Sequence, residues 1–469
     1  MEKSSRRDIE RALRLHNEGR LDDAAARYLD VLGRDPGNAD ALHLLGVLRS
    51  QQGQHRAAEA LIGEALAARA AWPEAHFNLG NAQLALGNAE AAATSFKRAL
   101  ELKPDNPHAH YNLGSALLTL ERFGAAAASY ERAVAALPGF AEAHMGLGVA
   151  LGQLGRLDEA VQSVRRAVAL QPAYASAHKY LGLTLRDLNR PGEAAAHLQR
   201  AAELEPGDAA TLNDLGAALR MANRREEAAA RFREAIGLDN NHAAARDNLG
   251  IVLGEMGRHA EAIAVLREAV NLSPDRAETW NNLGTSLMEA KHYGEAIESL
   301  RRATALAPDH PRALANLVHA RRIVCDWRDA DADEAELIAR VREGRGLDAP
   351  FAFLTIAGEP ADHLACASHY LRQRIPVKLP PLRPDAPYAH QRIRLGYLSA
   401  DFREHAVMQL IAELFELHDR GAFEVFGFSI GAPDQSPMRK RLERAFDHFI
   451  DLHAMDDETA AQTIRASEI

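Results

Sequence analysis

Six polar side chains recur along the chain at one fixed interval. They lie about 34 residues, or a whole multiple of that interval, apart, and each stands directly before a leucine: Asn78, Asn112, Asp214, Asn248, Asn282 and Asn316. Asparagine is only a middling helix former, so helix propensity does not explain this choice. An amide carries a donor and an acceptor, and a column of amides could pair with the backbone of an extended peptide without reading its side chains. The spacing leaves open the alternative that these residues only tie neighbouring repeats together.

A second group of reactive side chains follows a predicted strand near the C-terminal end, in the segment Ser399-Ala400-Asp401-Phe402-Arg403-Glu404-His405. Ligands of open α/β sheets sit at the carboxyl ends of the strands, which is where this segment is placed. His405 could act as a base near neutral pH, and Asp401 could orient it or cap the next helix. Plain capping and exposure to solvent is the alternative for both residues.

The elements that position the polar column are repeated helix pairs. A Leu-Gly step returns in every repeat from Leu45-Gly46 to Leu283-Gly284, and alanines stand at two fixed places after each glycine, such as Ala92 and Ala99 after Gly80. A helix-ending Gly or Asn stands at Gly19, Gly53, Gly87, Gly155, Asn189, Asn223 and Gly257, and prolines close most repeats. This period predicts tetratricopeptide repeats, which are antiparallel helix pairs, for instance Glu74 to Leu86 with Ala89 to Leu102. The column is interrupted at Leu44, Gly146 and Tyr180, so its middle is expected to be less polar.

The rest of the chain has a different character. We predict a repeat array over residues 1–318 (about nine repeats and a partial one), a helical bridge over 319–374, a linker with five prolines over 375–390, and an α/β segment over 391–469. In that last segment, strands at Ile393 to Ser399, Phe423 to Ile430 and Phe449 to Leu452 alternate with helices, which predicts a parallel sheet. The expected fold is therefore mostly α, with a right-handed superhelix followed by an incomplete Rossmann-like lobe.

Composition excludes several classes of function. The chain of 469 residues has a net charge of −10 and a pI near 6.1, which argues against a nucleic-acid-binding protein. Two cysteines, Cys325 and Cys366, are too few for a disulfide framework, and no residue spacing predicts a metal site. No signal-peptide pattern or run of about 18 apolar residues occurs, so we expect a soluble cytoplasmic protein without a membrane partner.

Together these segments resemble the protein O-linked N-acetylglucosamine transferases, including their SPINDLY-type relatives. The resemblance is carried by the asparagine column, by Ile323-Val324-Cys325-Asp326-Trp327, by Pro350-Phe351 with Phe353-Leu354, by Arg394 to His405, by Phe423 to Phe426 and by His448 to Leu452. It implies an inverting transfer of a sugar from UDP-GlcNAc to Ser or Thr, with the superhelix holding the acceptor polypeptide and His405 beside the sugar. It further implies no cofactor besides the donor and a possible homodimer.

The same resemblance implies that the UDP-holding half of the catalytic region would lie beyond Ile469. We therefore expect a truncated chain that is inactive as it stands. The alternatives are a non-enzymatic tetratricopeptide scaffold for protein–protein interaction and a relative that uses GDP-fucose.

Overall fold

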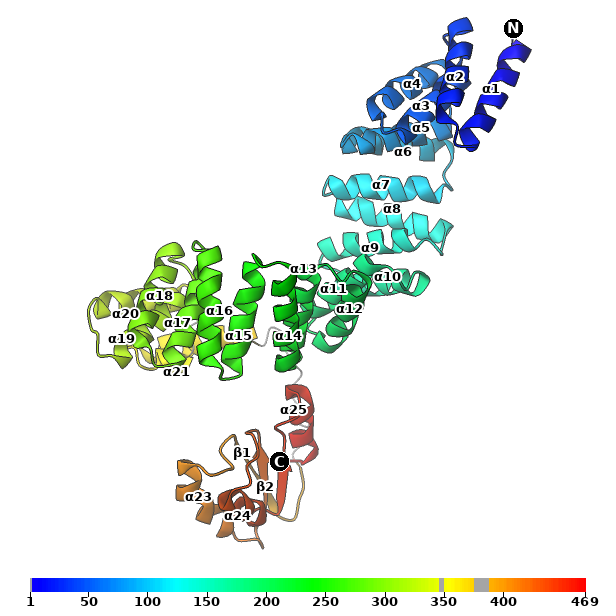
Figure 1. Ribbon diagram of the computed structural model, residues 1–469. Helices are drawn as coiled ribbons and strands as arrows, with labels where there is room; N and C mark the ends of the chain where they lie inside the picture. The colour runs from blue at the N-terminus through cyan, green and yellow to red at the C-terminus, as the bar shows by residue number, and fades with distance from the viewer. Residues whose placement is uncertain (1, 346–349, 375–387) are drawn as a thin grey trace. The chain divides into compact units, whose positions relative to one another are not determined.

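A computed structural model of the chain describes residues 2–345, 350–374 and 388–469. The chain divides into two compact units, Met1–Tyr370 and Leu371–Ile469, and each unit is described by itself. Figure 1 shows the first unit as a stack of helices and the second as a small sheet with helices. The proline-rich stretch predicted over 375–390 lies outside the described residues except for its last three.

The first unit consists of helix pairs stacked in chain order into a superhelix, as predicted. After the first helix, longer and shorter helices alternate; α3, for example, has 13 residues and α4 has 14 residues. The helices are α1 (Glu2–Asn17), α2 (Leu21–Arg34), α3 (Ala39–Gln51), α4 (His55–Ala68), α5 (Pro73–Ala85), α6 (Ala89–Leu102), α7 (Pro107–Thr119), α8 (Phe123–Ala136), α9 (Ala141–Gln153), α10 (Leu157–Leu170), α11 (Ala175–Asp187), α12 (Pro191–Leu204), α13 (Ala209–Met221), α14 (Arg225–Leu238), α15 (Ala243–Glu255), α16 (His259–Leu272), α17 (Ala277–Glu289) and α18 (Tyr293–Leu306).

Two features of the repeat sequence account for the helix pairs. All seven of the predicted turn residues adopt a positive φ, for example 79° at Gly87, which lets the chain reverse between the two helices of a pair. The glycine of the Leu-Gly step allows close packing, because a Cβ at Gly80 would lie 2.6 Å from Cε1 of the buried Phe96. Periodic sequence and local geometry therefore agree at these seven turns.

The array continues into α19 (Ala313–Ile323), which spans the predicted boundary at residue 318. The helices α20 (Ala330–Arg342), α21 (Pro350–Phe353) and α22 (Pro360–Arg374) follow in the segment predicted as a bridge. Their core is small and apolar, and it joins Leu314 and Val318 of α19 to Leu337, Phe353 and Cys366. No helix among the described residues is long and apolar enough to cross a membrane.

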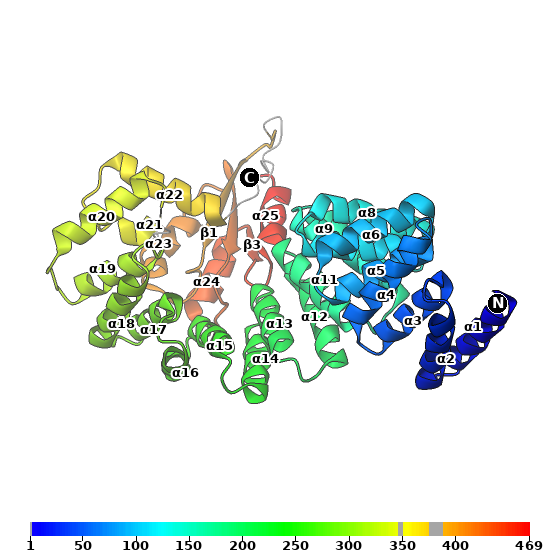
Figure 2. The ribbon, with the colours of Figure 1, turned by 90° about the horizontal axis from the view of Figure 1, so that it is seen from above.

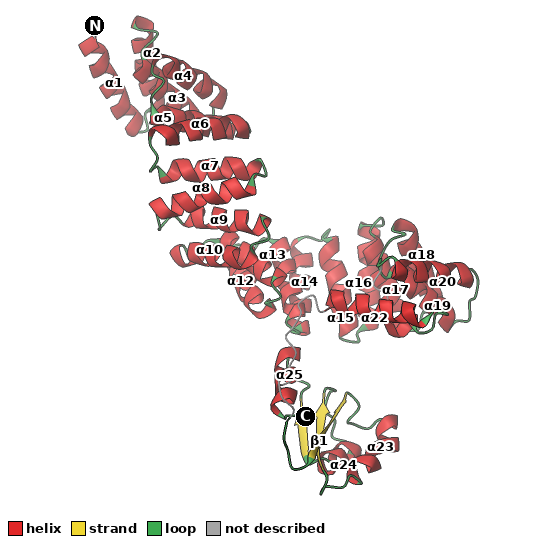
Figure 3. Ribbon diagram, turned by 180° about the vertical axis from the view of Figure 1, so that it is seen from behind, coloured by secondary structure: helices red, strands yellow, loops and turns green. Residues whose placement is uncertain are grey.

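The second unit is a three-stranded parallel sheet with helices between its strands, as predicted (Figure 3). Its elements are β1 (Ile393–Ser399), α23 (Ala406–Glu416), β2 (Phe423–Ser429), α24 (Pro437–Ala445), β3 (His448–Asp451) and α25 (Asp457–Ala466). The order is β1-β2-β3, with Ile393 opposite Phe423 and Phe426 opposite His448. All three strands therefore end at the same edge of the sheet, where Ser399, Ser429 and Asp451 lie.

Candidate functional site

The polar column lies on the first helix of each repeat that carries it. Its members come from α5, α7, α13, α15, α17 and α19, and all six are partly exposed. In Figure 2 the helices α11, α13 and α15 lie on the inner side of the curved array, and α12, α14 and α16 lie on its outer side. The column therefore follows the inner helices of the array.

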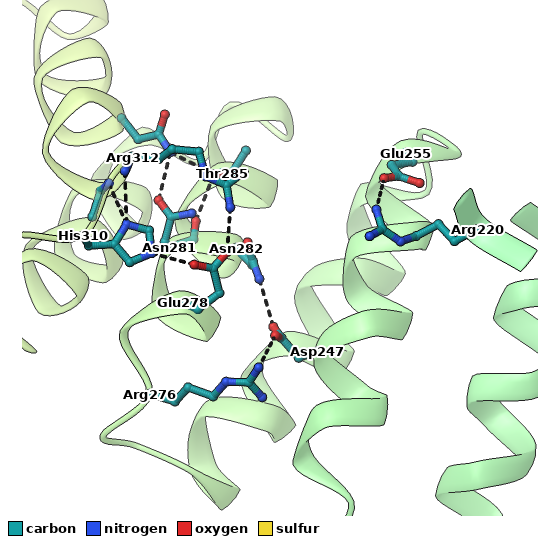
Figure 4. Close-up of polar contacts among 12 residues, drawn as sticks. Arg220, Asp247, Glu255, Arg276, Glu278, Asn281, Asn282, Thr285, His310 and Arg312 are labelled. Atoms are coloured by element: carbon teal, nitrogen blue, oxygen red, sulfur yellow. Dashed lines mark hydrogen bonds and ion pairs between the residues drawn. The ribbon is translucent and has the colours of Figure 1, made fainter. Parts of the chain in front are cut away.

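Hydrogen bonds connect the column from one repeat to the next. Nδ2 of Asn248 donates to Asn213 Oδ1 (2.9 Å), Nδ2 of Asn282 to Asp247 Oδ1 (3.1 Å), and Nδ2 of Asn316 to Asn281 Oδ1 (2.9 Å). Figure 4 shows the bond from Asn282 to Asp247. In each case the acceptor is the residue just before the column position of the preceding repeat.

The N-terminal members follow the same principle with other acceptors. Nδ2 of Asn78 contacts His43 Nε2 at 2.9 Å, and Nδ2 of Asn112 donates to Asn81 Oδ1 at 2.7 Å. The acceptors of the ties were not identified from the sequence. For Asp247 and Asn281, the dipeptides Asp247-Asn248 and Asn281-Asn282 are a visible signal. The structure therefore contains the ties between repeats that were the alternative interpretation of the column.

The ties use only part of the hydrogen-bonding capacity of each asparagine amide. An asparagine side chain has two N–H donors and an oxygen with two lone pairs, and a tie uses one donor. Among the described residues, no hydrogen bond reaches Oδ1 of the five column asparagines, and that oxygen is not buried. Each tie thus orients an amide whose acceptor still faces solvent, so a repeat tie and a peptide contact are compatible at the same residue.

Two carboxylates accompany the column. Asp247 is 2% exposed, and burial raises the pKa of its carboxyl, an effect that the hydrogen bond from Asn282 and the charge of Arg276 oppose. Asp214 does not join the amide ties; its carboxylate lies 3.5 Å from Nη1 of Arg186, and burial raises its pKa as well. Asp214 therefore differs chemically from the asparagines with which it shares the column.

Tyrosines occupy the interruption in the middle of the column. A Cβ at Gly146 would lie 2.6 Å from the ring of Tyr130, so no larger residue fits there beside that tyrosine. Tyr180 stands in the column itself, and its hydroxyl donates to Gly148 O at 3.4 Å. Aromatic rings therefore replace amides over two repeats.

A hollow of about 330 Å³ lies beside Asn282 and is lined by residues of α15 and α17 together with His259 and Arg312. Its charged rim is organised by ion pairs between Glu255 and Arg220 (2.7 Å) and between Arg312 and Glu278 (2.6 Å), as Figure 4 shows. This hollow is large enough for a side chain of a bound polypeptide.

His405 and Asp401 lie together after β1, in the loop where the sequence places them. His405 is the N-cap of α23, and its Nδ1 accepts a hydrogen bond from Val407 N at 3.3 Å. The same Nδ1 lies 3.7 Å from Asp401 Oδ2, beyond hydrogen-bonding distance, and the two side chains are 38% and 33% exposed. Capping therefore falls to His405 and not to Asp401.

The cap has a consequence for proton transfer. If Nδ1 accepts from Val407, the proton of the neutral ring sits on Nε2, and Nε2 can then donate but not accept. To serve as a base through Nε2, the ring must carry its proton on Nδ1, for which Asp401 is the available acceptor nearby. The geometry thus allows His405 to donate in the capped arrangement and to accept only after a small rotation towards Asp401.

The loop that carries both residues is held against the loop after β2. Ile430 N donates to Ser399 O (3.1 Å), and Glu404 N donates to Asp434 Oδ2 (3.0 Å). Gly431 passes so close to Ala400 that a Cβ there would collide with its backbone. Phe402, which is 1% exposed, anchors the loop in the core. Sequence reasoning missed Gly431 and Asp434, although they stand in the Gly-Ala-Pro-Asp turn that follows β2.

A hollow of the second unit lies away from this loop. It measures about 460 Å³ and is lined by Glu416, Pro437, Lys440, Arg441, Arg444 and Ala445, none of which belongs to the His405 loop. We give the strand-end loops more weight, because three chain segments converge there. In the described ranges, no three His, Cys, Asp or Glu side chains are grouped so that they could hold a metal ion.

Models of known families match both parts of the chain. Residues 377–469 match the family described as glycosyl transferase family 41. Tetratricopeptide-repeat models match residues 15–80, 80–121, 111–177, 179–243 and 253–320. The chain thus combines tetratricopeptide repeats with a segment that matches a glycosyltransferase family.

Curated relatives are similar over part of their length. A probable UDP-N-acetylglucosamine–peptide N-acetylglucosaminyltransferase SEC of Arabidopsis thaliana is 29% identical over 168 residues, which are 33% of this chain and 17% of the relative. A UDP-N-acetylglucosamine–peptide N-acetylglucosaminyltransferase of Caenorhabditis elegans is 28% identical over 145 residues, 28% of this chain and 13% of the relative. The matched parts therefore span less than a fifth of either relative.

Solved structures match part of this chain. In a crystal structure of MamA, the match covers 34% of this chain and 95% of the MamA chain, with 25% identity and a TM-score of 0.34. The match to the structure of Pseudomonas aeruginosa pilF covers 46% of this chain and 95% of the pilF chain, with 22% identity and a TM-score of 0.39.

Proposed function

We propose that this chain supplies the acceptor-holding array and the first catalytic lobe of a glycosyltransferase that moves N-acetylglucosamine from UDP-GlcNAc to Ser or Thr of polypeptides. The observation that carries the proposal is the family 41 match over residues 377–469, since that stretch contains the loop with Asp401 and His405. The cytoplasmic setting inferred from the sequence is part of the same proposal.

The array would hold an acceptor through its backbone. The free Oδ1 of each column asparagine accepts a peptide N–H. The second N–H of the amide donates to a peptide carbonyl, except at Asn316, whose Nδ2 also donates to Thr285 Oγ1 at 3.4 Å. Stacked helices lie about 8–10 Å apart, and an extended chain advances about 3.3 Å per residue, so one repeat would meet about every third residue of the acceptor. Contacts of this kind select an extended conformation and tolerate many sequences. The hollow beside Asn282 would take one of the acceptor's side chains.

The strand-end loop would meet the reacting atoms. Transfer of a sugar to a hydroxyl needs a positioned acceptor, removal of its proton and stabilisation of charge on the departing diphosphate. His405 is the titratable group for the proton, in the arrangement in which Asp401 accepts from Nδ1. The relatives match over 17% and 13% of their length, so we propose the transfer for the enzyme to which this chain contributes and acceptor binding for the chain itself.

Acceptor binding tests the first half of the proposal. We expect a fluorescent, extended peptide with Ser and Thr to bind the chain, with fluorescence anisotropy as the measurement. Replacement of Asn248, Asn282 and Asn316 by alanine should weaken the affinity at least tenfold, because backbone contacts at three repeats are lost. Asn271→Ala, on the outer helix α16, is the matched control. Affinity that is equal in the triple variant and in the control refutes the role of the column.

Mass spectrometry of the peptide after incubation with UDP-GlcNAc or GDP-fucose tests the second half. A mass increase with UDP-GlcNAc supports the proposed donor, and an increase with GDP-fucose alone replaces it. If an enzyme that contains this chain binds the peptide but transfers sugar to no peptide with either donor, the result would favour a non-enzymatic scaffold. His405→Ala should abolish transfer and leave the anisotropy unchanged.

A further inference from the structure

One buried arginine joins the three segments that meet at the carboxyl edge of the sheet. Arg439 comes from α24 and is 4% exposed. Its Nη1 donates to the backbone oxygen of Phe402 (3.1 Å), in the loop after β1, and to Ser429 Oγ (2.7 Å), at the end of β2. Its Nη2 donates to Asp451 Oδ2 (2.8 Å), at the end of β3. The guanidinium therefore touches the end of every strand or the loop that follows it.

The remaining contacts satisfy the charge and fix the plane of the guanidinium. Nε donates to Glu443 Oε1 at 2.9 Å, and the guanidinium lies over the ring of Phe449 with 4.5 Å between its carbon and the ring centre. Four of its five N–H groups can thus be assigned to a partner. Asp451 is itself held, because its Oδ1 accepts from His453 N at 2.9 Å.

These contacts require the shape of an arginine side chain. A flat fork can donate in several directions at once and stack on a ring, whereas a lysine ammonium is a compact point charge that cannot reach all of these acceptors. The exposed Arg441 on the same helix differs, since its only hydrogen-bond partner among the described residues is Glu416, in a pair at the surface. Strength of the fold alone does not require a buried cation here, because apolar residues often serve stability as well.

We propose that Arg439 is a positioning residue, which holds the loop of residues 400–405 so that Asp401 and His405 keep their place beside the ends of β2 and β3. The inference rests on the proposed function only in that this loop is taken as the reacting site. Arg439 acts through the backbone of Phe402, one residue from Asp401, and does not itself touch a substrate.

Hydrogen exchange of the intact chain, followed by mass spectrometry, tests the proposal without donor or acceptor. In Arg439→Lys we expect amides of the segment 399–405 to exchange at least tenfold faster than in the wild type, while β2 keeps its protection. In Arg441→Lys, the matched control, exchange of both segments should stay within twofold of the wild type. If Arg439→Lys also exposes β2, then Ser429→Ala, which removes one contact and no charge, should speed exchange of 399–405 about threefold. The proposal is overturned if the segment 399–405 exchanges at the wild-type rate in the variant, Arg439→Lys or Ser429→Ala, in which β2 stays protected.

A second readout separates positioning from a general loss of structure. The imidazole ¹³C resonance of His405, assigned by its absence in His405→Gln, should move in Arg439→Lys and stay in place in Arg441→Lys. An unmoved resonance would show that Arg439 supports the sheet and not the site. Failure of peptide binding or transfer would leave both readouts unaffected, so this proposal and the proposed function fail separately.

Discussion

The tie between Asn282 and Asp247 should show itself as a pH-dependent loss of stability when it is cut. Asn282→Ala removes the 3.1 Å bond to a carboxylate that is 2% exposed, and leaves it with the hydroxyl of Thr279 and with Arg276 at 3.6 Å. A buried acceptor that loses its partner costs about 1–3 kcal/mol, more when it is charged. We therefore expect Asn282→Ala to lower the free energy of unfolding by about 2–3 kcal/mol at pH 7.

The pH dependence follows from the pKa of Asp247. Burial raises this pKa above its ordinary value of 3.8, and the bond from Asn282 counteracts the rise. A carboxyl whose folded-state pKa is raised favours the fold in its protonated form, so its contribution is complete below pH 3.8 and is lost as pH rises through the folded-state pKa. Asn282→Ala raises that pKa further, and its cost should therefore shrink as the pH falls from 7 towards 4.

Urea unfolding followed by circular dichroism at pH 7 and pH 4.5 measures this effect. Asn316→Ala is the matched control, because it cuts the same tie to a neutral acceptor, Asn281, which is 1% exposed. We expect the control to cost about 1 kcal/mol at both pH values. Because other groups titrate equally in both variants, the difference between them isolates Asp247. Equal costs at both pH values for the two variants would refute the charged-tie reasoning.

Three further predictions concern packing and protonation. Burial lowers the pKa of His178 below 6.5, so the neutral ring favours the fold. This contribution to stability is lost as the pH falls through the lowered pKa. His178→Leu should remove that part of the acid sensitivity in pH-dependent urea unfolding. Gly146→Asn should lower the free energy of unfolding by about 1–3 kcal/mol, because the new side chain overlaps Tyr130. Tyr130→Leu should relieve this overlap in a double-mutant cycle, and additive costs of the two substitutions would contradict the prediction. Phe402→Ala should cost about 3–5 kcal/mol and unfold the second unit while the array keeps its helical signal, which a single shared transition would contradict.

The sequence alone determined the elements of both units. The repeat period, turn residues with positive φ and alternating strands and helices are local patterns, and each one specifies structure within about one repeat or one strand. The loop with Asp401 and His405 could likewise be placed from sequence, because it directly follows a strand of a parallel sheet.

Tertiary structure alone decided how these residues are used. The acceptor of Asn282 is Asp247, 35 residues away, and the loop carrying His405 is held by Arg439, which lies 37 residues from Phe402. Such contacts depend on the rotation and register with which separate elements pack, and no local pattern encodes those. The same holds for His405, where a cap on Val407 N decides which ring nitrogen carries the proton. The physical reason is that the sequence period sets which residues share a face, while only packed neighbours set the partner that each polar group finds.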